Sequence, residues 1–162
     1  MSKSKTKNET VKRISQLTVI NPTAAGIDVS DKEMMVAYPI GSGQLEVRSF
    51  GCFTSDLHAI AKTLRKFSIT SVAMESTGVY WIPLFLLLQE YGFEVCLVNA
   101  KHVKNVTGRK DDESDAEWIQ KLHSCGLLKA SFQPDSLTRT LRSIVRNRKS
   151  LERTCSSYIN RI

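Results

Sequence analysis

Two carboxylates interrupt apolar runs that are typical of buried strands. Asp28 lies between Ile27 and Val29, and Glu75 follows the apolar residues 72–74. A carboxylate at the place of a hydrophobe is costly unless it is paired or bound to a cation. Open α/β sheets also bind ligands at the carboxyl ends of their strands, where Glu75 is expected. If the two strands are neighbours, both carboxylates face one point.

A third acidic element lies further along the chain, at residues 110–116. It contains four acidic residues in five positions, among them Asp112 and Asp115. Residues three apart share one face of a helix, so we expect these two side chains to project together. Four neighbouring acids repel one another, and a divalent cation would compensate their charge.

The donor set of Asp28, Glu75, Asp112 and Asp115 consists of oxygen alone. Oxygen ligands without His or Cys favour Mg²⁺ or Mn²⁺ over zinc. Two such ions can activate an attacking oxygen and stabilise a leaving oxygen in phosphodiester transfer. Each element also has a plainer interpretation: a lone Asp at a strand end forms turns, and acids in a first helical turn stabilise the helix dipole.

The elements that must position these residues follow from hydrophobic periodicity and from turn residues. Short connections between the first three strands predict an antiparallel meander, and the later strands alternate with helices. The expected class is α/β with a mixed five-stranded sheet and flanking helices. The expected strands are 23–30, 33–40, 44–50, 69–75 and 93–99, and the expected helices are 54–67 (capped by Thr54, Ser55 or Asp56), 79–91, 100–106 and 113–125.

From Ser136 onward the apolar period changes. Apolar residues recur in steps of four and three from Leu137 to Ile162, with Arg148 interrupting the series. This is the a/d seam of a coiled coil, which predicts self-association through the helix. No capping Gly or Pro precedes Ile162, so we expect a longer coiled-coil helix that is truncated here. The alternative is an amphipathic helix that packs on its own domain.

Charge is unevenly distributed along the 162 residues. The net charge is +4 over residues 1–20, −3 over 21–136 and +6 over 137–162, and the total is +7. Basic segments that flank an acidic core are compatible with a polyanionic partner, although a solubility tail and a solvated helix face would give the same pattern. The four cysteines are far apart, which favours a reduced, cytoplasmic protein without a membrane span or secretion signal.

Four motifs in order resemble one known family. Gly26-Ile-Asp-Val-Ser30, Met74-Glu-Ser-Thr-Gly-Val-Tyr80, Val98-Asn-Ala-Lys101 and Gly108-Arg-Lys-Asp-Asp-Glu-Ser-Asp-Ala116 are similar to motifs of the insertion-sequence one-hundred-ten family. These are DEDD transposases, related to Piv-type DNA invertases. Their N-terminal domain resembles the RuvC resolvase and is ribonuclease-H-like. Asp111 stands where the family usually has Ser or Thr, and the spacing to Asp115 favours Asp112 as the ligand.

The resemblance implies that Asp28, Glu75, Asp112 and Asp115 are the catalytic metal ligands for DNA cleavage and transfer. It also implies a structured guide RNA and a C-terminal serine domain, which this chain lacks. The expected division is a basic disordered arm (1–20), a catalytic domain (21–134) and the start of a coiled-coil helix (135–162). The fragment is expected to be inactive alone. The expected nucleic-acid contacts are Lys101, Arg109, Lys110, Arg142, Arg146, Arg148 and Lys149.

Three other interpretations compete with this one. A stand-alone Holliday-junction resolvase or nuclease would use the same four acids. An actin-like or sugar-kinase fold also has a Gly-Ile-Asp strand before a hairpin, but no second phosphate loop is present. A non-enzymatic nucleic-acid-binding dimerisation module would carry the acids as structural residues, and loss of metal binding in Asp28→Asn would distinguish the enzyme from it.

Overall fold

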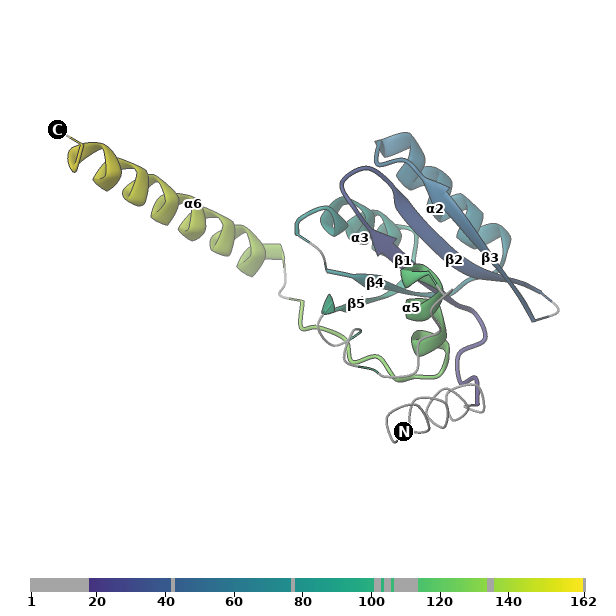
Figure 1. Cartoon of the computed structure of the whole chain (residues 1–162). Coiled ribbons are helices and arrows are strands. Elements are labelled where there is room, and N and C mark those ends of the chain that lie inside the picture. The colour runs from purple at the N-terminus through teal and green to yellow at the C-terminus, as the bar shows by residue number, and fades with distance from the viewer. Residues whose placement is uncertain are drawn as a thin grey trace, which may run out of the picture. The chain divides into compact units, whose positions relative to one another are not determined.

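The computed structural model describes residues 18–41, 43–76, 78–100, 103, 106, 114–133 and 136–161. The chain forms two compact units, Met1–Ser131 and Phe132–Ile162, which are described separately here (Figure 1). The four carboxylates belong to the first unit. Of the helices in the described ranges, none combines the length and apolar character that crossing a bilayer needs.

The first unit is built on a mixed five-stranded sheet with the order β3-β2-β1-β4-β5. β2 is antiparallel to both β1 and β3, whereas β1, β4 and β5 are parallel to one another. The predicted meander is therefore confirmed, and the first and fourth strands are neighbours, which the sequence left open. The strands are β1 Ala24–Val29, β2 Met34–Gly41, β3 Gln44–Phe50, β4 Ser71–Glu75 and β5 Glu94–Val98.

Helices cover both faces of this sheet, which confirms the expected flanking helices. α2 (Thr54–Lys66) and α3 (Trp81–Glu90) pack on one face, over a core that includes Ile27 and Met74. α5 (Asp115–Ser124) packs on the other face through Trp118, Ile119 and Leu122 (Figure 1). Alternate residues of β1 and β4 therefore belong to different cores, as the period of a strand requires.

The start of α2 differs from the prediction that Thr54, Ser55 or Asp56 caps it. The N-cap residue is Phe53, whose backbone amide donates to Asp56 Oδ2 at 3.1 Å. Asp56 thus acts from the third helical position, where a carboxylate also suits the helix dipole. The capping carboxylate comes from inside the helix, so the identity of the N-cap residue does not reveal it.

α5 lies directly on the backbone of β1. A Cβ atom at Gly26 would collide with the backbone of Ala116 and Gln120, so only glycine permits this approach. Gln120 Nε2 also donates to the carbonyl oxygen of Ala24 at 3.1 Å. The helix is therefore fixed on β1 at close range.

A partly buried polar pair joins the other end of α5 to β4. Ser71 Oγ and His123 Nε2 are 2.7 Å apart. Burial lowers the pKa of His123, and the negative charge of Glu94 opposes this effect. A neutral imidazole can share this hydrogen bond at neutral pH without carrying a charge into the sheet interface. In the sequence His123 has no partner at metal-ligand spacing, and Ser71, its hydrogen-bond partner, lies 52 residues away.

The second unit contains α6 (Ser136–Ile159), a helix of 24 residues. This confirms the predicted helix, while its pairing in a coiled coil stays a prediction. The apolar seam residues Leu137, Leu141, Ile144, Leu151 and Tyr158 are all exposed within this unit. An exposed stripe of this kind on a helix is the surface that a coiled-coil partner covers.

We expect Gly26→Ala to destabilise the first unit by about 1–3 kcal/mol, the usual effect of overpacking a core. The added methyl group must push α5 away from β1. Chemical denaturation measures the loss, and hydrogen exchange should accelerate in α5 more than in α2. An unfolding free energy equal to that of the wild type would contradict this account of the α5 contact.

Candidate metal-binding and catalytic site

Asp28 and Glu75 lie side by side because of the register between β1 and β4. The parallel pairing matches Gly26 with Ala73 and Ile27 with Met74, and the two carboxylates are the next residue on each strand. Residues at matching positions of parallel neighbours point to the same face. The structure thus places both side chains on one face at the carboxyl ends of these strands.

The face they share is the one that α5 covers. Residues two apart on a strand point to the same face of the sheet. Asp28 therefore shares its face with Gly26, which contacts α5. Glu75 shares its face with Ala73, which belongs to the core under α5. Asp28 is half-buried and Glu75 is only 8% exposed. Such positions hold a carboxylate out of bulk water, so compensating partners are required.

Asp115 is the first residue of α5 and is exposed. The helix runs antiparallel to β1, since its first turn meets Gly26 while its last residue, Ser124, accepts hydrogen bonds from Ile20 and Asn21. The beginning of α5 therefore lies toward the carboxyl end of β1, where Asp28 is found. Three of the four predicted ligands lie toward this edge of the sheet, but the described side chains do not form a group that could hold a metal.

A capping box fixes where α5 begins. Ser114 Oγ accepts from the backbone amide of Glu117 at 3.3 Å, and Glu117 Oε2 accepts from the backbone amide of Ser114 at 2.8 Å. Ser114 has an extended backbone, with φ −66 and ψ 160. The helix therefore starts at Asp115 and not at Glu113, because the reciprocal hydrogen bonds satisfy its first amides at that point.

This start corrects one step of the sequence analysis. Because α5 begins at Asp115, with Ser114 as its N-cap, the helical spacing to Asp115 no longer favours Asp112 over Asp111. Asp112 lies outside the described residues, as do Lys101, Arg109, Lys110 and most of the predicted helix 100–106. Within the described ranges, no group of three His, Cys, Asp or Glu side chains could hold a metal.

The turn after β4 was interpreted incorrectly from the sequence. The apolar neighbours of Tyr80, Trp81 and Trp118 in the sequence predict that all three are core anchors, and Trp118 is indeed buried. Tyr80 is 48% exposed and Val79 is 66% exposed, while Trp81 is only partly buried. The apolar stretch that follows Gly78 suggested a helix from Val79, but α3 begins at Trp81. Both residues before it lie on the surface.

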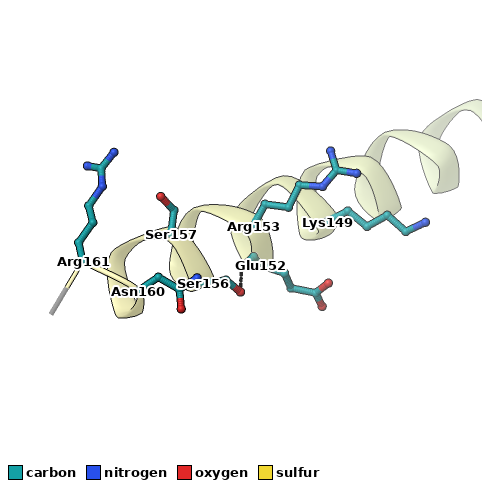
Figure 2. Close-up of a pocket in the computed structure, with 7 residues that line it drawn as sticks. All are labelled: Lys149, Glu152, Arg153, Ser156, Ser157, Asn160 and Arg161. Atoms are coloured by element: carbon teal, nitrogen blue, oxygen red, sulfur yellow. Dashed lines mark hydrogen bonds between the residues drawn. The ribbon is translucent and has the colours of Figure 1, made fainter.

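The basic side chains of α6 that were predicted to contact nucleic acid are all exposed. If Leu141 and Ile144 occupy seam positions a and d, then Arg142 and Lys149 occupy b and Arg146 occupies f, on the side away from the seam. Lys149 and Arg153 extend from α6 beside Glu152 (Figure 2). Arg148, on the seam, donates to Glu152 at 2.7 Å in an exposed i,i+4 pair.

Comparison with known proteins identifies the family. Residues 25–162 match the family of IS110 DEDD transposases, described as "Transposase". The chain belongs to this family. The assignment confirms the resemblance carried by the four motifs and connects the chain with DNA recombination. No curated protein matches the sequence.

Three solved structures are similar to this transposase chain. Thermus thermophilus RuvC with a Holliday junction substrate has 16% identity and a TM-score of 0.49, and the match covers 67% of this chain and 99% of that chain. Thermus thermophilus RuvC has 18% identity and a TM-score of 0.44, with the same coverage. The fowlpox virus resolvase, in a complex with Holliday junction DNA, has 15% identity and a TM-score of 0.37, with 54% and 67% covered.

Proposed function

We propose that the first unit is the catalytic domain of a metal-dependent transposase that cleaves and transfers DNA strands. The observation that carries this proposal is the parallel register of β1 and β4, which makes Asp28 and Glu75 neighbours on one face. Asp115 reaches the same edge from α5. Asp112 is proposed as the fourth ligand on the family motif alone.

The donor type of the residues at this edge fits a hard divalent cation, although the three described carboxylates do not by themselves form a group that could hold one. They supply only carboxylate oxygens, and their positions range from buried Glu75 through half-buried Asp28 to exposed Asp115. A site of this kind is enclosed by the sheet on one side and accessible on the other. Mg²⁺ or Mn²⁺ prefers such oxygen ligands and keeps several waters or substrate oxygens in its coordination sphere.

Bound metal would supply Lewis-acid stabilisation of the phosphate and a lowered pKa for an attacking hydroxyl or water. The protein contributes the geometry. The two strands hold Asp28 and Glu75 at a separation set by the sheet, and α5 holds Asp115 through its contact with Gly26. Rigid elements keep side chains in place better than loops do.

The family resemblance supports two further parts of the proposal. A structured RNA selects the DNA, and a serine from a C-terminal domain serves as the nucleophile beside the carboxylates. Exposed basic residues of α6 are proposed to bind nucleic acid, and the exposed apolar seam of α6 is proposed to join two copies. Lys101, Arg109 and Lys110 are proposed as phosphate contacts next to the acidic residues.

We expect Mn²⁺ to raise the melting temperature of the chain, because a ligand that binds only the folded state stabilises it. At a hundredfold excess over Kd the gain is about 2.7 kcal/mol. Asp28→Asn, Glu75→Gln and Asp115→Asn should each remove the gain, whereas Glu90→Gln at the end of α3 should retain it. If all four variants keep the same Mn²⁺-dependent gain in melting temperature as the wild type, the metal binds elsewhere.

The affinity for nucleic acid should fall steeply as the salt concentration rises. In a plot of the logarithm of the association constant against the logarithm of the salt concentration, each phosphate neutralised on duplex DNA contributes about −0.9 to the slope. The double variant Arg142→Gln and Arg146→Gln should flatten this slope. The matched control, Lys62→Gln with Lys66→Gln on α2, should leave it unchanged. Fluorescence anisotropy with labelled DNA measures both, and equal slopes for the two double variants would refute a role for α6.

Incubation of the same complexes with Mg²⁺ should give no strand transfer, because the proposed serine nucleophile comes from another domain. Robust cutting that Asp115→Asn abolishes would instead show a self-sufficient nuclease. The resolvase interpretation would then replace the transposase mechanism, while the carboxylate site would stand.

We expect the chain to form a concentration-dependent dimer in sedimentation experiments. Pairing removes the exposed apolar seam of α6 from water, and Arg148 on that seam limits its strength. Leu141→Glu with Ile144→Glu should give a monomer, whereas Ser143→Glu, off the seam, should not. A strict monomer for the wild-type chain at high concentration would exclude the coiled coil.

A further inference from the structure

The turn between β4 and α3 presents two apolar residues to solvent at the edge that carries the carboxylates. Val79 and Tyr80 follow buried Glu75 by four and five residues. Five residues span at most about 18 Å, so the backbone of Tyr80 stays within that distance of the backbone of Glu75. A DNA strand bound at the site would pass this turn within a few nucleotides of the reacting phosphate.

Several contacts hold the turn in this conformation. The backbone amide of Ser76 donates to the carbonyl oxygen of Val98 at 2.9 Å, which joins the turn to the end of β5. Trp81 Nε1 donates to the carbonyl oxygen of Gly78 at 3.2 Å. The Trp81 ring in turn meets Phe85 edge-on, with 5.4 Å between the ring centroids. Trp81 thus anchors the turn on α3.

The Tyr80 ring itself rests against Gly78. Gly78 has a positive φ of 57°, and a Cβ there would be 3.4 Å from Tyr80 Cδ2 and Cε2. Within the described part of the chain, no other aromatic ring or cation covers Tyr80. An aromatic side chain held at the surface by a fixed turn loses little conformational freedom when a ligand stacks on it.

We propose that Tyr80 stacks on an unpaired base of the DNA bound at the carboxylate site, with Val79 packing beside it. The inference rests on the proposed function, because DNA reaches Tyr80 only if it binds at the carboxylate site. Aromatic rings bind unpaired bases by stacking on them, and such contacts tolerate any base. The uncharged ring also suits an edge that already carries several acids, since a base brings no further negative charge.

The experiment uses a duplex with a single-stranded gap whose thymines are replaced by 5-iodouracil. Irradiation should crosslink the full chain to the gap, and mass spectrometry should locate the adduct at Tyr80. Tyr80→Phe keeps the ring and should retain both crosslink and affinity. Tyr80→Leu keeps apolar bulk without a ring, so it should lose the crosslink and weaken binding by roughly fivefold or more.

Three controls make the result specific. Phe53→Leu changes another exposed aromatic residue, which is 81% exposed at the start of α2, and should behave as the wild type. A fully paired duplex with 5-iodouracil should give little adduct at Tyr80. A single-stranded RNA with the same base distinguishes stacking on RNA, and an adduct at Tyr80 with RNA but not with gapped DNA would overturn the proposal.

The two proposals fail in different ways. If the wild type binds gapped DNA and Tyr80→Leu binds it equally well, base stacking by Tyr80 is wrong and the carboxylate site is unaffected. If the wild-type chain binds no DNA at any salt concentration, the proposed function fails and this inference fails with it. Melting temperatures show whether each variant is folded. If Tyr80→Leu does not fold, the crosslink of the folded wild type still decides, because the absence of an adduct at Tyr80 with gapped DNA would overturn the proposal.

Discussion

The parallel pairing of β1 with β4 is the constraint on which the candidate site depends. It sets Asp28 and Glu75 beside each other on the face toward α5, although like charges in a poorly solvated place repel. Apolar burial on the opposite face of the sheet offsets the cost of this repulsion. There, Ile27 and Met74 from the same two strands are fully buried in the larger core with α2 and α3. Because side chains alternate along a strand, one face contributes to the core while the other carries the proposed site.

The docking of α5 extends this arrangement to a third carboxylate. The helix meets β1 where Gly26 has no side chain, and it is joined to the sheet further along through Gln120 and the Ser71–His123 hydrogen bond. Because the helix is rigid, contacts along its length determine where its first residue lies. Asp115 is therefore positioned by residues that are not themselves proposed as metal ligands. Substitutions in this interface would be felt at the site without touching a ligand.

α6 presents a different balance of forces. Its apolar seam is exposed within the second unit, and its basic residues mostly lie on other sides of the helix. One helix can thereby offer an apolar surface to a partner chain and a positive surface to phosphate. The proposed pairing and the proposed nucleic-acid binding need not compete, since hydrophobic burial and counterion release would act on separate sides of the same helix.

The sequence by itself determined the five strands, the main helices, the sheet class and the two interior carboxylates. These follow from local periodicity and turn residues, and β3 was predicted with its observed bounds. The fourth strand begins at Ser71 and not at Ile69, and α3 begins at Trp81 and not at Val79. Element ends depend on capping and neighbouring segments more than on pattern.

Tertiary structure decided what periodicity does not encode. The requirement for glycine at Gly26 comes from a helix about 90 residues away in the sequence, and the His123 hydrogen bond comes from a strand 52 residues away. The exposure of Tyr80 depends on how Trp81 anchors the turn, which an apolar sequence around both residues conceals. Local pattern reports which residues prefer burial, whereas only the packing of distant segments settles which of them are covered.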